Sequence, residues 1–124
     1  MAEQYDQAAL RHFQDASLLE NNRRLANADQ LYGLAAECAL KWVWPKTGTP
    51  LKKKHIDELW EQVRLSSKTP PCLITLLRQP NPFADWSVEQ RYEKDSVVTQ
   101  SSIDQHRQIA KRLLGAVRLL GVSP

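Results

Sequence analysis

Arg91 and Tyr92 are the two neighbouring side chains best suited to hold a phosphate group. An arginine guanidinium can form two parallel hydrogen bonds to phosphate oxygens, and a tyrosine can stack on a base or donate its hydroxyl. Ser87 is a good helix N-cap with Gln90 three residues later, which predicts a short helix carrying both residues in its second turn. The alternative is a local salt-bridge network, because acidic residues flank the arginine: Glu89, Glu93 and Asp95.

Glu37 and Lys41 form a second candidate pair, spaced four residues apart in the order that favours an ion pair on a helix. An exposed pair of this kind stabilises a helix by only about 0.3 kcal/mol. The pair occupies a narrow polar strip on an otherwise apolar helix, so it either is an ordinary surface pair or lines a groove or a dimer seam. The strip consists of Gln30, Gly33, Glu37, Lys41 and Trp44.

The three histidines and two cysteines are scattered along the chain. His12 and His106 fall on apolar helix stripes, where a pair could bind a metal or transfer protons. No carboxylate or cysteine stands beside either at ligand spacing, so hydrogen-bonded core or interface histidines are favoured, and no metal or other cofactor is expected. His55 follows lysines 52–54 and either packs against that loop or contacts an anion.

The sequence carries no recognised catalytic signature. The patterns GxSxG, HExxH and GxGxxG are absent, and neither Cys38 nor Cys72 has a recognisable catalytic partner. The glycine-containing segment before lysines 52–54 lacks the GxxxxGK[ST] pattern of a phosphate loop, so the lysines are interpreted as a solvated basic patch. No catalytic residue is assigned.

Apolar residues recur at helical spacing along most of the chain, which predicts an all-α fold. The segment 28–44 is apolar over most of its circumference and should be buried by neighbours on several sides. Asn27 is expected to cap its beginning, and Pro45 should end it. The other predicted helices span about 3–24, 55–66, a short helical turn that Pro70 and Pro71 start and that continues through Leu77, a short helix after Ser87, and about 101–120.

Length and composition are those of one globular domain covering residues 1–124. Charged residues make up 25% and apolar residues 42% of the chain, and no apolar run approaches a membrane span. The first residues lack the apolar core of a signal peptide, so a cytoplasmic location without membrane contact is expected. The net charge of +3 permits an anionic partner but falls below that of a dedicated nucleic-acid binder.

A homodimer is expected from the amount of apolar surface. The last predicted helix carries an a/d seam that one small bundle can hardly cover together with the apolar helix 28–44. The seam consists of Ile103, His106, Ala110, Leu113, Val117 and Leu120.

Three segments together resemble the HEPN-domain family of small prokaryotic helical proteins. Residues 34–41 (LAAECALK) are similar to its alanine-rich E-x-x-L-K second helix. His55, Ile56 and Leu59 are similar to the histidine that often opens the next helix, and residues 86–92 (WSVEQRY) are similar to a W-x-x-x-x-R-Y element. The resemblance implies an up-and-down bundle of four to five helices, usually a homodimer. It also makes Arg91, Tyr92, His55, Lys41 and Glu37 the candidate ligand-binding residues.

The best-known activity of that family is metal-independent RNA cleavage by an R-x4-6-H motif paired across the dimer. No arginine here is followed by a histidine five to seven residues later. The missing motif argues against ribonuclease activity without deciding it. The resemblance then implies a non-catalytic protein that binds a nucleotide or RNA or accompanies a nucleotidyltransferase, in toxin–antitoxin or phage-defence settings. Two alternatives stay open: a pure protein-interaction module, and a divergent ribonuclease that uses Arg91 with His55 or His106.

Overall fold

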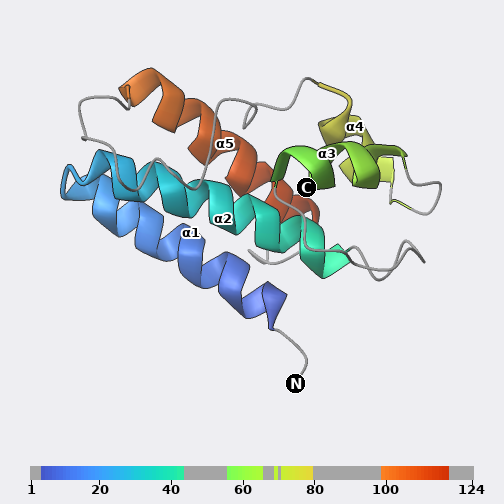
Figure 1. Cartoon of the computed structure of the whole chain (residues 1–124), viewed down its shortest axis with the longest axis horizontal. Helices are drawn as coiled ribbons and strands as arrows, with labels where there is room; N and C mark the ends of the chain where they lie inside the picture. The colour runs from blue at the N-terminus through green and yellow to red at the C-terminus, as the bar shows by residue number, and fades with distance from the viewer. Residues whose placement is uncertain (1–3, 44–55, 66–68, 70, 80–98, 118–124) are drawn as a thin grey trace.

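A computed structural model describes residues 4–43, 56–65, 69, 71–79 and 99–117. Every regular element in these ranges is a helix, which confirms the predicted all-α bundle (Figure 1). The short helix predicted after Ser87 lies outside the described residues. The helices are α1 (Tyr5–Asn21), α2 (Leu25–Val43), α3 (Ile56–Leu65), α4 (Pro71–Leu77) and α5 (Gln100–Ala116).

The turn between α1 and α2 brings these two helices side by side as an antiparallel hairpin (Figure 1). Arg23 takes the left-handed conformation with φ 62°. The N–H of Arg24 donates to the carbonyl of Leu19 at 2.9 Å, and the N–H of Arg23 donates to that of Glu20 at 3.0 Å. This pair of bonds is the Schellman motif, in which a left-handed residue closes the end of a helix.

The prediction that Asn27 caps the second helix is wrong. The backbone N–H of Ala28 donates to the carbonyl of Arg24 at 2.9 Å, so the helical ladder is already formed there. α2 begins at Leu25, and Asn27 is an exposed residue inside it. The Schellman turn reverses the chain within a few residues, and the next helix can therefore start three residues before the predicted position.

α2 is the central helix and packs against α1, α3 and α5. Its alanines allow this close packing on several sides, because Ala35, Ala36 and Ala39 have no exposed surface. Tyr32 and Leu40 of the same helix are also fully buried. The prediction that neighbours surround this helix is confirmed.

α3 and α4 pack together beside α2 and are joined through a tryptophan. Leu59, Trp60 and Val63, which lie at helical spacing on α3, have no exposed surface. The indole N–H of Trp60 donates to the carbonyl of Leu77 at 3.2 Å, and this bond satisfies a polar atom that burial would otherwise leave without a partner.

α5 begins at a capped end and ends earlier than predicted. The Thr99 hydroxyl oxygen accepts a hydrogen bond from the backbone N–H of Ser102 at 3.1 Å. The helix ends at Ala116, with Val117 as its C-cap, rather than near residue 120.

Within one chain, the seam residues of α5 from Ile103 to Leu113 are already buried. Ile103, Ala110 and Leu113 have no exposed surface, and His106 is 1% exposed. The surface argument for a homodimer is thereby removed for these positions, and the dimer now depends on the family resemblance. None of the described helices is both long and apolar enough to cross a membrane.

Candidate functional site

The structure places two of the five predicted ligand-binding residues. Glu37 and Lys41 lie on the C-terminal half of α2. His55, Arg91 and Tyr92 lie outside the described residues, so their position relative to α2 remains a prediction.

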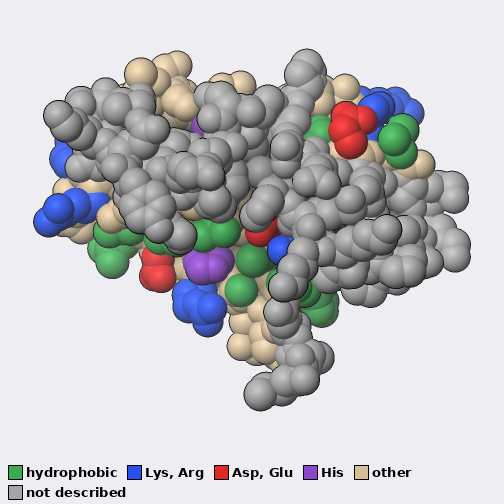
Figure 2. All heavy atoms as spheres, in the orientation of Figure 1, with side chains coloured by type: hydrophobic (Ala, Val, Ile, Leu, Met, Phe, Trp, Pro, Cys, Tyr) green, Lys and Arg blue, Asp and Glu red, His purple; other side chains and the backbone are tan. Residues whose placement is uncertain are grey.

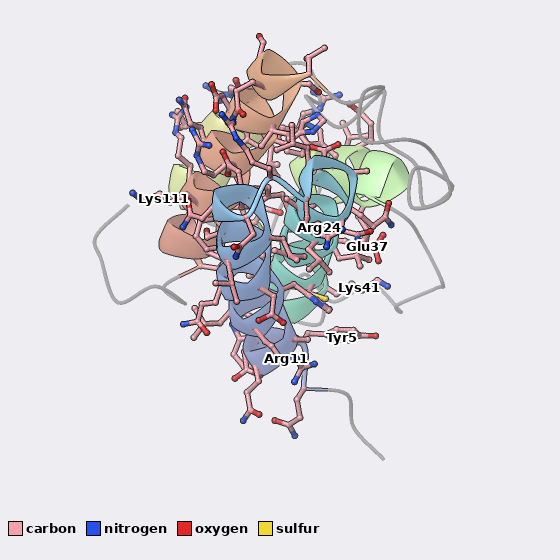
Figure 3. The ribbon with its side chains drawn as sticks, turned by 90° about the vertical axis from the view of Figure 1, so that its left-hand side faces the viewer. Tyr5, Arg11, Arg24, Glu37, Lys41 and Lys111 are labelled. Atoms are coloured by element: carbon pink, nitrogen blue, oxygen red, sulfur yellow. The ribbon has the colours of Figure 1, made fainter. Side chains whose placement is uncertain are left out.

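Glu37 and Lys41 form an ion pair beside an aromatic ring of α1. The Lys41 Nζ atom lies 3.3 Å from Glu37 Oε2, and the two side chains are only 18% and 8% exposed. The same Nζ atom lies 5.6 Å from the centre of the Tyr5 ring, within cation–π range. Figure 3 shows Tyr5, Glu37 and Lys41 on one side of the molecule and Lys111 on the opposite side. This site therefore offers a carboxylate, an ammonium and an aromatic ring in a place that water reaches poorly.

His12 is electrostatically linked to this site. Burial lowers the pKa of His12 below its ordinary value of 6.5, and the charge of Arg11 lowers it further. The charges of Asp15 and Glu37 act in the opposite direction but do not overcome these effects. Burial and Arg11 therefore favour the neutral form of the His12 ring. Histidine, acidic and basic side chains are seen together on the face shown in Figure 2.

The polar strip of α2, here defined as Gln30, Gly33, Glu37 and Lys41, is more buried than a surface strip. Gln30 is 5% exposed, and Gly33 and Glu37 are also buried. Its fifth predicted member, Trp44, lies outside the described residues. The alternative of an ordinary solvated pair at Glu37 and Lys41 therefore does not fit.

A second polar pair joins α2 to α5 inside the core. The Asp29 Oδ1 atom lies 2.5 Å from His106 Nδ1, and both side chains are 1% exposed. This contact confirms the interpretation of His106 as a hydrogen-bonded core histidine. Asp29 was not among the predicted site residues, although a signal was present: Asp29, Tyr32 and Ala36 follow the spacing of one buried helix face.

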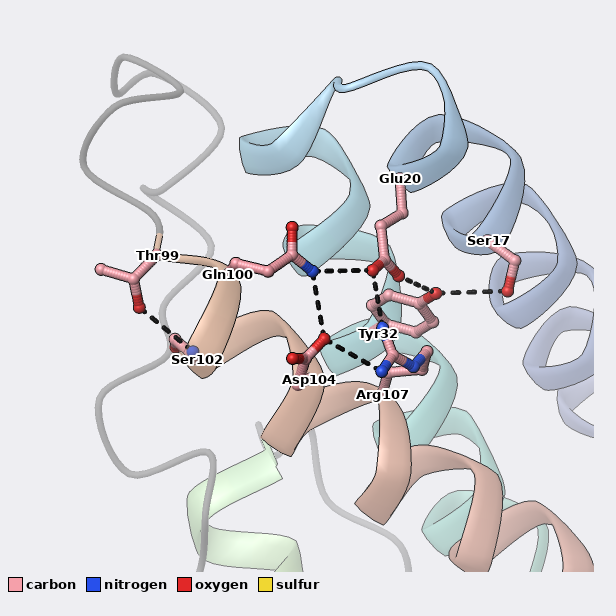
Figure 4. A network of polar contacts seen from close by, with 8 residues as sticks. All are labelled: Ser17, Glu20, Tyr32, Thr99, Gln100, Ser102, Asp104 and Arg107. Atoms are coloured by element: carbon pink, nitrogen blue, oxygen red, sulfur yellow. Dashed lines mark hydrogen bonds and ion pairs between the residues drawn. The ribbon is translucent and has the colours of Figure 1, made fainter.

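Glu20 is the centre of a polar network that ties the opposite end of α2 to α1 and α5 (Figure 4). The Tyr32 hydroxyl donates to Glu20 Oε1 at 2.8 Å and lies 3.2 Å from the Ser17 hydroxyl. Arg107 donates to Glu20 Oε2 at 2.6 Å, and Gln100 donates to the same oxygen at 3.0 Å. Sequence spacing could not predict this network, because its members come from three distant segments of the chain.

The network changes the pKa values of its members in opposite directions. Burial acts to raise the pKa of Glu20, but hydrogen bonds from Tyr32, Arg107 and Gln100 outweigh it and hold the pKa below 4.5. Burial raises the pKa of Tyr32 to about 12, and its bond to Glu20 adds to the rise. Glu20 therefore holds three helices together, because its two carboxylate oxygens accept from Tyr32 on α2 and from Gln100 and Arg107 on α5.

Within the described ranges, no three histidine, cysteine, aspartate or glutamate side chains are grouped to hold a metal ion. Comparisons of the chain with protein-family models, curated proteins and solved structures gave no match. The HEPN resemblance therefore stays a proposal.

Proposed function

We propose that this chain is a HEPN-like homodimeric protein that binds a nucleotide or a short RNA without cleaving it, and that its partner is a nucleotidyltransferase. The observation that carries the proposal is the position of Lys41, whose ammonium lies 3.3 Å from the Glu37 carboxylate and 5.6 Å from the centre of the Tyr5 ring. These three groups match the parts of a nucleotide. An ammonium can pair with a phosphate, an aromatic ring can stack on a base, and a carboxylate can accept hydrogen bonds from base N–H groups.

The low exposure of the site strengthens each of these contacts. A charge that is poorly solvated attracts a counter-charge more strongly than the same charge in water. Lys41 is 18% exposed, so a phosphate that reaches it is screened less than at a surface lysine. The net charge of +3 adds a weak general attraction for anions.

The burial of His106 supports the non-catalytic part of the proposal. A histidine that acts on RNA must reach the phosphodiester, whereas His106 is 1% exposed and is bonded to Asp29 inside the core. The divergent ribonuclease would then have to use His55 or another histidine beside Arg91.

Titration with mononucleotides and a short RNA, at low and moderate salt, tests the proposal. Lys41→Ala and Arg91→Ala should each weaken binding at least about tenfold, because each removes a charge-assisted contact to phosphate. Lys111→Ala is the matched control, since Lys111 is exposed on the opposite side of the molecule (Figure 3). Binding of no nucleotide by the wild type, or equal binding by all variants, contradicts the proposal and leaves the protein-interaction module as the better candidate.

Two further measurements complete the test. Incubation with the same RNA should leave it intact, and cleavage that Arg91→Ala abolishes would support the ribonuclease instead. Sedimentation at a protein concentration on the order of tens of micromolar, where a specific interface of ordinary size should be occupied, should give a dimer. A monomer at that concentration contradicts the homodimer.

A further inference from the structure

The turn between α1 and α2 exposes two neighbouring arginines that have no carboxylate partner. Asn21, Asn22, Arg23 and Arg24 are all exposed. Within the described ranges, neither guanidinium forms an ion pair. The sequence has no acidic residue at positions 21–28. Two unpaired positive charges therefore stand together at this end of the hairpin.

The acidic residues on either side of the turn are already bonded elsewhere. Glu20 accepts from Arg107 at 2.6 Å and from two further donors on α2 and α5. The carboxylate of Asp29 contacts His106 inside the core and is 1% exposed. Both carboxylates are thus engaged with other partners, and the charge of the turn is left for a group from outside the chain.

Arg23 occupies a backbone position that glycine would fill at lower cost. Its φ of 62° is the left-handed conformation that closes the end of α1. Glycine takes this conformation freely, whereas a residue with a β-carbon loses stability in it. An outlier of this kind at an exposed position indicates a use for the side chain itself.

The turn lies on the same side of the hairpin as the Lys41 site. Figure 3 shows Arg24, Glu37 and Lys41 along one side of the molecule and Lys111 on the opposite side. Lys41 stands 16 residues beyond Leu25, the first residue of α2, which corresponds to about 24 Å along the helix axis. A stacked nucleic-acid strand carries one phosphate per roughly 3.4 Å, so about seven nucleotides span this distance.

We propose that the α1–α2 turn contacts the backbone of a single-stranded RNA that also occupies the Lys41 site. The guanidinium groups of Arg23 and Arg24 suit phosphate oxygens, to which each can form two parallel hydrogen bonds. Asn21 and Asn27 are exposed next to them in the chain, and an amide can both donate to and accept from a base edge. An acidic protein offers carboxylates to the arginines but no such edge, so RNA fits the turn better. The inference rests on the proposed function and selects RNA over a mononucleotide as the ligand.

Titration with UMP and with an RNA of about eight uridine nucleotides tests this assignment. Wild type should bind the RNA at least about tenfold more tightly than UMP, because only the RNA reaches the turn. Arg24→Gln should weaken RNA binding about tenfold and leave UMP binding unchanged. The slope of log K against log salt should also become shallower by roughly 0.7, the value for one phosphate contact to a single strand. Lys111→Gln removes the same charge on the opposite side of the molecule, so it is the matched control and should leave both affinities unchanged.

Arg23→Gly separates the use of the side chain from the stability of the turn. Glycine suits a φ of 62°, so the ligand-free variant should melt at or above the temperature of the wild type. The same variant should bind the RNA about tenfold more weakly, because it lacks the guanidinium. A weaker affinity in a variant of equal or higher Tm cannot be attributed to unfolding, and an unchanged affinity overturns the assignment.

The outcomes separate the two proposals. Equal affinity for UMP and the RNA, or RNA binding that Arg24→Gln leaves unchanged, overturns the role of the turn and leaves the nucleotide-binding function standing. Binding of neither ligand by the wild type overturns both. A glutamate peptide of the same length as the RNA should bind more weakly than the RNA does. Equal binding of the peptide overturns the choice of RNA and means that the turn fits an acidic protein.

Discussion

The carboxylate of Asp29 on α2 lies 2.5 Å from Nδ1 of His106 on α5, and the two residues are 77 positions apart in the chain. This contact joins the central helix to the last helix at a place with almost no access to water. Together the two buried side chains form a bond that specifies how α5 lies against α2.

Asp29→Ala should lower the free energy of unfolding by about 2 kcal/mol or more, because it leaves the His106 ring without this partner in the core. Urea unfolding at pH 7 measures the effect. Asp15→Ala is the matched control, since Asp15 is exposed on α1 and should change stability by less than about 0.5 kcal/mol. Equal losses in the two variants would mean that the buried contact contributes no more than a surface aspartate.

Glu20 should make stability depend on pH in the acid range. Its pKa in the folded protein lies below the ordinary value of 4.5, so the stability that it contributes is present above pH 4.5 and is lost as the pH falls through the lower folded value. Urea unfolding between pH 3 and pH 7 (roughly the carboxylate range) should show a shallower pH dependence for Glu20→Gln than for the wild type. Glu61→Gln should change the pH dependence less, because the Glu61–Arg64 pair is exposed and solvent weakens it. Parallel curves for wild type and Glu20→Gln would contradict the network.

Arg23→Gly should stabilise the protein by roughly 0.5–1 kcal/mol. Arg23 has φ 62°, a conformation that costs an ordinary residue about 1–2 kcal/mol and costs glycine nothing. Glycine also raises the conformational entropy of the unfolded chain, which offsets part of this stabilisation. Thermal or urea unfolding measures the change. Arg24→Gly, at the next position where φ is not positive, should give no gain. A loss of stability in Arg23→Gly would show that its side chain matters more than its backbone.

The titration of His12 reports on the surroundings of Glu37. Its ring should titrate below pH 6.5 by NMR, because burial and Arg11 disfavour the charged form. Arg11→Ala should raise this pKa, whereas Glu37→Gln should lower it further, since Glu37 favours the charged ring. Shifts in the opposite directions would contradict the placement of these three side chains.

Much of the helical architecture follows from the periodicity of apolar residues. Leu59, Trp60 and Val63 recur at helical spacing, and all three are fully buried. The start of α2 was predicted wrongly because asparagine is a common N-cap residue. The actual turn is closed by backbone hydrogen bonds around Arg23, and arginine has no preference for the left-handed conformation found there. Local propensity cannot identify a turn that tertiary packing imposes.

The candidate site was predictable in part for a similar reason. Glu37 and Lys41 could be paired because they belong to one helix, and their spacing alone brings them together. Spacing also placed Gln30 on the same strip, but it could not add Tyr5 or predict that Gln30 is buried. Tyr5 reaches Lys41 only through the packing of α1 on α2, and the burial of Gln30 depends on neighbours that helical spacing does not describe.

The network around Glu20 sets an order in which the bundle can assemble. Its bond to Tyr32 spans 12 residues across a tight turn, whereas its bond to Arg107 spans 87 residues. Closing the shorter loop costs less chain entropy, so the α1–α2 hairpin should form early and α5 should dock on it late. In stopped-flow folding measurements, Arg23→Gly should therefore change mainly the refolding rate, whereas Arg107→Ala should change mainly the unfolding rate.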